Sequence, residues 1–119
     1  MSSLADSPFR LSGDPTRPEL LAKYFRALGD PTRLRILQLL SQRERRVGEL
    51  VDVLGTSQPH VSNHLACLRW CGFVETRREH RAIYYRLADE RVSAIVTLAD
   101  DLLEQNAEHV ACCRRIDPT

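Results

Sequence analysis

Two histidines and two cysteines lie at four-residue intervals in the segment PHVSNHLACLRWCGF, residues 59–73. The histidines are His60 and His64, and the cysteines are Cys67 and Cys71. On a helix that turns about 100° per residue, all four side chains fall within a sector of roughly 60°. Thiolates and imidazoles bind soft metal ions, and thiols are also redox groups. This flank of the predicted helix is therefore the first candidate for chemistry.

The other two cysteines, Cys112 and Cys113, are adjacent near the C-terminus. We expect a cytoplasmic protein, because the sequence shows no secretory leader and no apolar run close to the roughly 20 residues that span a bilayer. Cytoplasmic thiols are seldom structural disulfides, so the four cysteines are expected to be core residues, redox groups or metal ligands. Their arrangement in pairs favours the last two, although a free cysteine often packs simply as a small hydrophobe.

The rest of the predicted helix divides between a buried face and a surface suited to nucleic acid. Val61, Leu65 and Leu68 share one face and are expected to pack on the core. The N-terminal half of such a helix is the part that enters the major groove of DNA. The side chains there that can contact bases or phosphates are those of Ser57, Gln58, His60, Ser62, Asn63 and His64. For the two histidines we expect DNA contact or helix packing, not metal ligation.

The chain of 119 residues has a net charge of +1 that is unevenly distributed. Residues 26–81 hold ten arginines against six acidic residues, a local charge of +4, whereas residues 88–119 hold three arginines against seven acidic residues, a local charge of −4. A basic middle favours an anionic partner, although a solvated surface of mixed charge explains the count alone equally well. Arg77, Arg78 and Arg81 flank a predicted hairpin tip, where they are suited to phosphate or minor-groove contacts.

Hydrophobic periodicity and capping signals predict five helices and one β-hairpin. The predicted helices are residues 19–29, 30–41, 47–55, 57–72 and 89–110, and the predicted strands are residues 73–79 and 82–87. The order α-α-α-α-β-β-α is that of a winged helix-turn-helix, in which a short helix, a tight turn at Gly55 and a longer helix form the DNA-binding unit. The expected fold is therefore mainly α with a small β-hairpin.

The last predicted helix has a larger apolar face than so small a body needs. We therefore expect a homodimer formed through the first and last helices. Residues 1–18 are assigned to a flexible N-terminal arm, because they are rich in proline and polar residues without periodicity. Residues 19–105 are assigned to a DNA-binding and dimerisation domain, and residues 106–119 to a C-terminal tail with two cysteines.

The segments LGDPTRLRILQLL, VGELVDVLG, SQPHVSNHLACLRWCGFV and AIYYRLAD together resemble the ArsR/SmtB family of small bacterial metal-sensing repressors. The resemblance covers about residues 19–105. Within the family the chain is most similar to the actinobacterial cadmium/lead sensors, whose recognition helix also carries a Cys-Leu-Arg-x-Cys segment. The resemblance implies a homodimer that binds double-stranded operator DNA without metal and releases the DNA when metal binds.

Two metal sites of the family lack their ligands in this sequence. Members with a Cys-x-Cys pair on the first helix of the helix-turn-helix have thiols where this chain has Val51 and Val53. Members with a site on the last helix have four ligands at the places that Asp89, Arg91, Leu102 and Gln105 occupy here. The resemblance therefore implies a site made by Cys67 and Cys71 with a tail cysteine from the other subunit. That cysteine is either Cys112 or Cys113.

The expected function is a metal-responsive transcriptional repressor whose effector is a soft divalent ion. Cd(II), Pb(II) and Hg(II) suit a sulfur-rich site, and Zn(II) also accepts thiolate ligands. One alternative is a repressor of the same fold that senses thiol oxidation. Another is a metal-binding buffer protein that never contacts DNA. No residue arrangement indicates an enzyme.

Overall fold

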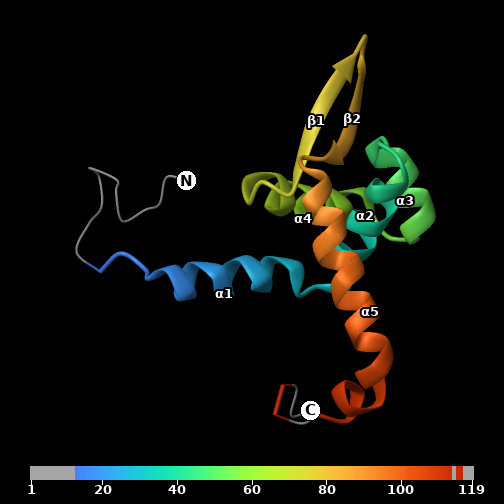
Figure 1. The fold of residues 1–119 in the computed structure, drawn as a ribbon. Helices are drawn as coiled ribbons and strands as arrows, with labels where there is room; N and C mark the ends of the chain where they lie inside the picture. The colour runs from blue at the N-terminus through green and yellow to red at the C-terminus, as the bar shows by residue number, and fades with distance from the viewer. Residues whose placement is uncertain (1–12, 114, 117–119) are drawn as a thin grey trace.

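The computed structural model describes residues 13–113 and 115–116 of the chain. Five helices and a two-stranded antiparallel hairpin make up this part of the chain (Figure 1). Their bounds are α1 Arg17–Leu28, α2 Pro31–Gln42, α3 Val47–Leu54, α4 Gln58–Trp70, β1 Val74–Glu79, β2 Ala82–Leu87 and α5 Glu90–Cys112. The winged helix-turn-helix predicted from the sequence is confirmed. Most of the predicted N-terminal arm, residues 1–12, lies outside the described residues.

Polar side chains set the first residue of several helices. Helix α1 begins at Arg17, two residues earlier than expected, because Thr16 and Glu19 form a reciprocal capping box. Helix α2 begins after Asp30, whose carboxylate oxygen Oδ1 accepts hydrogen bonds from the backbone N–H groups of Thr32 at 2.8 Å and Arg33 at 3.1 Å. These acceptors satisfy N–H groups that the first turn of a helix leaves without a partner.

The turn between α3 and α4 has the geometry of a helix-turn-helix. Gly55 ends α3 in the left-handed region at φ 67°, where a residue with a Cβ would be strained. Ser57 then caps α4, because its hydroxyl accepts a hydrogen bond from the backbone N–H of His60 at 3.3 Å. Only Thr56 therefore separates the C-cap of α3 from the N-cap of α4, the recognition helix.

The core lies where α2, α3, α4 and the start of the hairpin meet. Val61, Leu65 and Leu68 of α4 are fully buried, which confirms the predicted core face of this helix. Phe73, the residue before β1, is also fully buried, and its ring lies 4.3 Å from that of Tyr24 in α1. This contact joins α1 to the end of α4.

The hairpin is attached to the body through a pair of backbone hydrogen bonds that the sequence did not indicate. The N–H of Arg45 donates to the carbonyl of Tyr85 at 3.0 Å, and the N–H of Tyr85 donates to the carbonyl of Arg45 at 2.8 Å. The buried Arg45 side chain donates from Nε to the carbonyl of Leu39 at 3.1 Å and from Nη2 to the side chain of Gln42 at 2.7 Å. The α2–α3 connection is thus joined to the base of the wing by one isolated antiparallel β-bridge.

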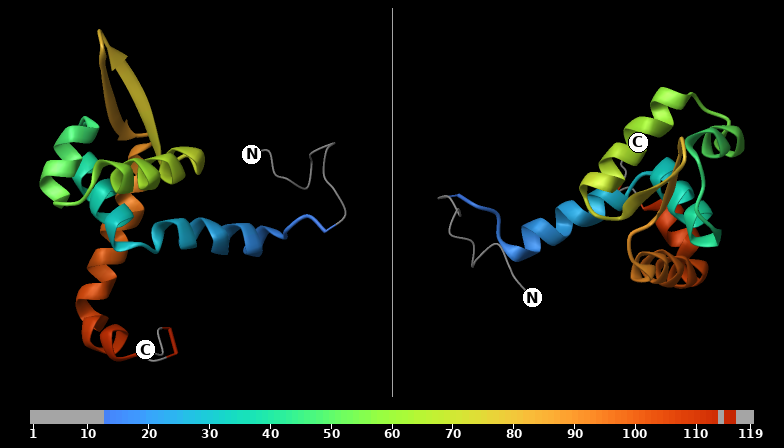
Figure 2. Two further views of the ribbon diagram at one scale, coloured as in Figure 1. Left: turned by 180° about the vertical axis from the view of Figure 1, so that it is seen from behind. Right: turned by 90° about the horizontal axis from the view of Figure 1, so that it is seen from above.

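Helix α1 and the C-terminal half of α5 project away from this core (Figures 1 and 2). They carry large apolar side chains that a single chain leaves exposed, with Phe25 54% and Leu102 60% accessible to solvent. Trp70 at the end of α4 is 91% exposed. Among the described residues, no helix combines the length and the apolar character needed to cross a membrane.

The buried ring of Phe73 allows a direct test of this packing. Phe73→Ala is expected to lower the free energy of unfolding by about 3 to 5 kcal/mol, because it removes apolar burial and leaves a cavity beneath α1 and α4. Urea denaturation at fixed protein concentration measures the change. The control is Ile83→Ala in β2, where the side chain is largely exposed. A loss as small as that of the control would show that Phe73 does not support the core.

Candidate functional site

The N-terminal half of α4 presents a polar surface to solvent. Gln58, Ser62 and Asn63 are exposed on this part of the helix, opposite the buried Val61. Their side chains are free to meet a groove of DNA. Ser57 is also exposed, but its hydroxyl is used as the helix cap. Gln58, Ser62 and Asn63 are therefore on one exposed surface, with Ser57 at its edge.

His64 differs from its neighbours because its imidazole turns toward the body. Its side chain is only 12% exposed, and its Nδ1 accepts a hydrogen bond from Nε of Arg33 at 3.0 Å. The Oδ1 atom of Asp30 lies 3.9 Å from the same nitrogen. His60, by contrast, is exposed, and its ring meets the edge of the His64 ring at a centroid distance of 4.6 Å. Only His60 of the two faces solvent.

The surroundings of His64 favour its neutral form. Burial lowers its pKa, and the positive charge of Arg33 acts in the same direction, while Asp30 opposes both. For Asp30, partial burial raises the pKa, but hydrogen bonds from the backbone of Arg33 and Thr32 and the nearby His64 outweigh it, so the pKa is lowered overall. At neutral pH the cluster therefore consists of a neutral imidazole between a carboxylate and a guanidinium.

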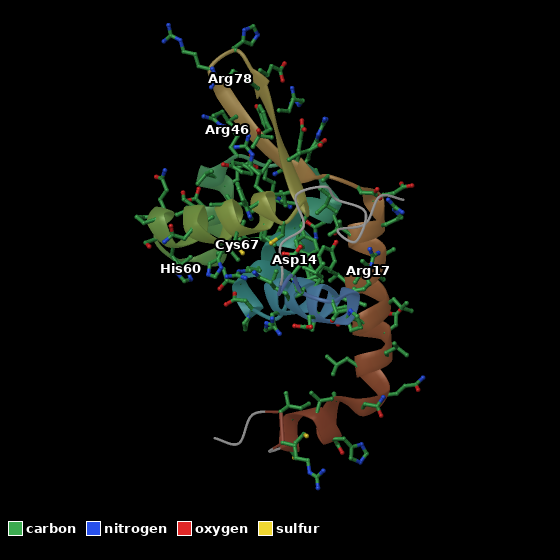
Figure 3. The ribbon with its side chains drawn as sticks, turned by 90° about the vertical axis from the view of Figure 1, so that its left-hand side faces the viewer. Asp14, Arg17, Arg46, His60, Cys67 and Arg78 are labelled. Atoms are coloured by element: carbon green, nitrogen blue, oxygen red, sulfur yellow. The ribbon has the colours of Figure 1, made fainter. Side chains whose placement is uncertain are left out.

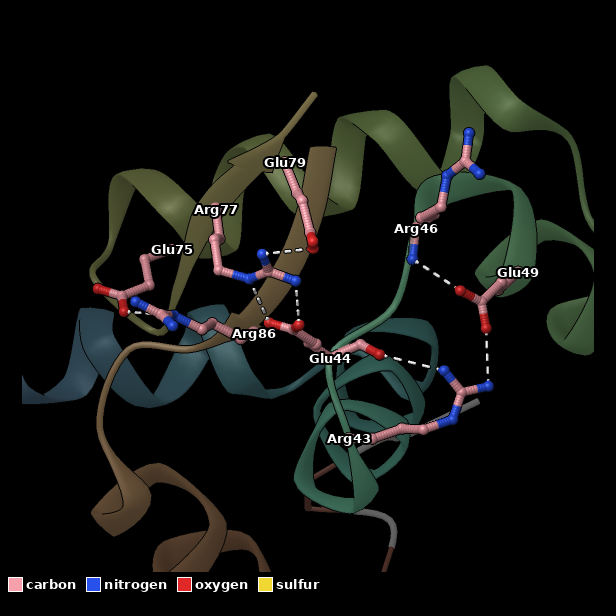
Figure 4. Close-up of polar contacts among 8 residues, drawn as sticks. All are labelled: Arg43, Glu44, Arg46, Glu49, Glu75, Arg77, Glu79 and Arg86. Atoms are coloured by element: carbon pink, nitrogen blue, oxygen red, sulfur yellow. Dashed lines mark hydrogen bonds and ion pairs between the residues drawn. The ribbon is translucent and has the colours of Figure 1, made fainter. Parts of the chain in front are cut away.

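The three wing arginines are placed differently from one another. Figure 3 shows Arg78 at the tip of the hairpin, and Figure 4 shows Arg77 among its ion-pair partners. Arg77 forms ion pairs with Glu44 and, at 2.8 Å, with Glu79, and its guanidinium lies 4.7 Å from the ring centre of Tyr84. These contacts hold β1 against the α2–α3 connection. Arg78 and Arg81 are exposed at the tip of the hairpin, where they can meet phosphates.

Glu44 was not predicted from the sequence, because it lies 33 residues from Arg77. It accepts hydrogen bonds from both Nε and Nη2 of that guanidinium. The hydrogen bond from Arg77 is the main reason why the pKa of Glu44 is lowered. Such a two-point pair fixes orientation as well as distance. The sequence carried no signal for it, since only the folded hairpin brings the two residues together.

Cys67, in the last turn of α4, and Cys71, the C-cap residue of this helix, form a thiol pair. Both are half-buried, and the backbone N–H of Cys71 donates to the carbonyl of Cys67 at 3.0 Å. Burial raises the pKa of the Cys71 thiol, and the neighbouring Cys67 raises it further. Arg33 and Lys23 act on the same thiol in the opposite direction. The surroundings of Cys71 thus favour its thiol form overall, although two cations beside it favour the thiolate.

The tail cysteines lie at the far end of α5 from this pair (Figure 1). Cys112 is the last residue of α5 and is exposed, and Cys113 caps the helix and is half-buried. Within residues 13–113 and 115–116, no group of three cysteine, histidine or acidic side chains is close enough to hold a metal ion. One chain therefore supplies two neighbouring sulfur ligands. A thiophilic ion fits them only if a further ligand comes from elsewhere.

The sequence matches known regulators over the region just described. The family model described as "Bacterial regulatory protein, arsR family" matches residues 30–76. A "Probable mercury resistance operon repressor" from Streptomyces lividans is 46% identical over 101 residues, which are 85% of this chain and 81% of that protein. The regulator KmtR of Mycobacterium tuberculosis is 43% identical over 90 residues, which are 76% of this chain and 66% of KmtR.

Solved structures of other proteins have the same fold as this chain. The crystal structure of Rv0081 from M. tuberculosis superposes with a TM-score of 0.75 at 31% identity and covers 83% of this chain and 100% of that one. A homodimeric winged helix-turn-helix DNA-binding domain from Mycobacterium bovis superposes with a TM-score of 0.69 at 34% identity, over 83% of this chain and 95% of that domain. The fold and the exposed surface of α4 are those of a winged helix-turn-helix transcriptional regulator. The chain belongs to the arsR family of bacterial regulatory proteins.

The His64 cluster predicts a pH dependence of stability. Because the folded-state pKa of His64 lies below its ordinary value, its contribution to stability is complete above about pH 6.5 and is lost as the pH falls through the lower folded-state pKa. His64→Gln should therefore lose less stability than the wild type between pH 7.5 and pH 5.5 in urea titrations. His80→Gln, at the exposed wing tip, is the control. Equal losses in the wild type and His64→Gln would contradict the assignment.

Proposed function

We propose that the chain is a cytoplasmic, homodimeric repressor that binds operator DNA without metal and releases it when a soft divalent ion binds. The ion is held by Cys67 and Cys71 together with Cys112 or Cys113 of the partner subunit. Hg(II), Cd(II) and Pb(II) are the effectors that suit such a site, and Zn(II) is a weaker candidate. The observation that carries the proposal is the position of the thiol pair at the C-terminal end of the recognition helix, where Cys67 lies in the last turn of α4 and Cys71 is its C-cap.

The DNA-binding part of the proposal rests on the exposed side chains of two elements. Helix α4 offers Gln58, Ser62 and Asn63, which have the donors and acceptors needed to contact base edges in the major groove. The wing offers Arg78 and Arg81, which suit the phosphate backbone. Base contacts would supply sequence selectivity, and the wing would supply affinity that depends on salt.

The homodimer is proposed from the apolar side chains that one chain leaves uncovered. Phe25 of α1 and Leu98, Leu102 and Leu103 of α5 are large and exposed. A soluble chain is expected to cover such helix faces, and a second copy does so symmetrically. The homodimeric relative from M. bovis has the same fold, which supports this arrangement. The projecting α5 would then carry its tail cysteines toward the partner.

The metal site is proposed from the sulfur atoms that this chain provides. When bound, the ion supplies coordination bonds that join α4 of one subunit to the tail of the other. Cys67 and Cys71 are four residues apart and can ligate one ion, while Lys23 and Arg33 lower the cost of a thiolate charge on Cys71. The relative from S. lividans is named for a mercury resistance operon, which supports a soft metal as effector.

Substitutions on α4 and on the wing should affect DNA binding differently. Arg78→Ala is expected to weaken binding to operator and random DNA alike, because it removes a phosphate contact. The slope of log affinity against log salt concentration should become shallower by about 1, since one fewer counterion is released. Asn63→Ala is expected to cost about 1 to 3 kcal/mol on operator DNA and little on random DNA, because it removes a base contact. Fluorescence anisotropy with the DNA upstream of the gene, over a range of salt concentrations, measures both.

The two variants serve as controls for each other, since each removes one exposed polar side chain. Equal losses by both variants on operator and random DNA would contradict the division into selective and unselective contacts. Failure of the wild type to bind any DNA would instead support a metal-buffering protein.

The cysteine pairs should separate DNA binding from its regulation. Cys67→Ser and Cys71→Ser are expected to bind operator DNA without metal but to lose release by Hg(II) or Cd(II), because they remove the ligands on α4. A Cys112→Ser, Cys113→Ser double variant should still bind metal, more weakly and with little release. The coupling lost in each case is expected to be about 1 to 3 kcal/mol. DNA titrations with and without metal, in a non-chelating reductant, measure it.

Absorbance in the thiolate-to-metal charge-transfer region, recorded in the same titrations, shows whether sulfur binds the ion. Release by an oxidant together with no such band on adding Cd(II) would favour a thiol redox sensor. Full release from the tail double variant at saturating metal would remove the cross-dimer link from the proposal.

A further inference from the structure

Arg33 joins three helices through one side chain. It lies in the first turn of α2, where the Asp30 cap accepts a hydrogen bond from its backbone N–H. Its Nη1 donates to the backbone carbonyl of Ala27 at 3.2 Å, and its Nε donates to Nδ1 of His64 at 3.0 Å. Ala27 is in the last turn of α1, and His64 is in the middle of α4. The guanidinium therefore connects α1 to the recognition helix.

Both acceptors have few other ways to be satisfied. The carbonyl of Ala27 is among the last four of α1, which have no partner within the helix. The imidazole of His64 is largely buried, so loss of the Arg33 donor would leave its Nδ1 without a hydrogen bond from Arg33 in a site that water reaches poorly. A planar guanidinium can serve two acceptors at once with fixed geometry, whereas a lysine ammonium on a flexible chain cannot reproduce that geometry.

The position of His64 on α4 makes this connection relevant to DNA. His64 follows Asn63 and is one turn from His60, so it belongs to the half of the helix that carries the polar surface. A dimer contacts two half-sites through two recognition helices, whose separation and angle must match the DNA. Any residue that fixes α4 relative to the dimer helix α1 therefore affects recognition without touching DNA.

We propose that Arg33 is a positioning residue for DNA recognition, which holds the DNA-contacting half of α4 at a fixed angle to α1 through His64 and Ala27. The inference rests on the proposed DNA-binding function and on the dimer through α1. It gives His64 an internal role in place of the base contact expected from the sequence. The connection through Arg33 also lies near the thiol pair, because Arg33 acts electrostatically on Cys71 as well.

The test compares Arg33→Lys with the wild type in binding to the DNA upstream of the gene and to random DNA. The substitution keeps the positive charge and removes the planar donor pair. Operator affinity is expected to fall by about 10- to 100-fold, the effect of losing a hydrogen bond to a charged group. The slope of affinity against salt should stay unchanged, because no phosphate contact is lost. Random DNA should be bound nearly as before.

Variants at His64 separate this role from general damage to the fold. Asn places an amide oxygen near the position of Nδ1, so His64→Asn is expected to retain much of the operator affinity that His64→Leu loses. Combining Arg33→Lys with His64→Leu should be no worse than His64→Leu alone, because either substitution already breaks the connection between α1 and α4. Circular dichroism and sedimentation confirm that each variant is folded and dimeric. Arg35→Gln, on the exposed face of the same helix, is the control for charge.

The outcomes distinguish this inference from the proposed function. If the wild type does not bind operator DNA, the proposed function fails. If the wild type binds and Arg33→Lys binds equally well, the positioning role fails. A reduced salt slope for Arg33→Lys would show a direct phosphate contact and would also overturn it, as would additive losses in the Arg33→Lys, His64→Leu combination.

Discussion

The burial of one face of α4 determines what every other side chain of that helix can do. Val61, Leu65 and Leu68 are fully enclosed by α2, α3 and the start of the hairpin. A helix is stiff, so fixing these three side chains also fixes the directions of the others. Asn63 is left facing solvent, and Cys67 is left half-buried in the last turn of the helix. The surface proposed for DNA and the thiols proposed for metal are thus two sides of one packed element.

Three arginine side chains connect different elements of this small fold. Arg45 is buried under the base of the wing, Arg77 pairs with Glu44, and Arg33 connects α1 to α4. The guanidinium suits such positions because it stays charged and donates several hydrogen bonds in a fixed plane. Part of the basic character of residues 26–81 is therefore used inside the molecule. The exposed wing-tip residues Arg78 and Arg81 remain for an anionic partner.

The proposed metal ligands are next to the proposed DNA-contacting residues, because both are carried by the recognition helix and its C-cap. An ion that binds Cys67 and Cys71 acts on the same rigid element that carries Asn63, so no chain of intermediate contacts is required. A ligand changes DNA affinity only if it binds the DNA-competent and incompetent states differently. A tether to the partner subunit supplies such a difference, because it constrains the angle between α4 and the dimer helices. Arg33 holds that angle in the absence of metal.

The order of elements, the caps at Asp30, Gly55 and Ser57 and the core face of α4 followed from the sequence alone. These features depend on local signals, such as Asp30 before Pro31, Gly55 after a short apolar helix, and apolar residues repeated at helical spacing. The family resemblance also followed from local motifs, and the comparisons confirmed it. The pairing of Cys67 with Cys71 was evident because both lie on one helix.

Only the tertiary structure decided which polar residues face inward. Arg77 and Arg78 are neighbours in the sequence, yet the pleat of the strand directs one toward Glu44 and leaves the other in solvent. The sequence could not distinguish His60 from His64 either, and the tie from Arg33, 31 residues away, made the difference. Such contacts depend on the angles between packed helices and strands. Local spacing determines which residues share an element, and packing between elements determines which of them meet.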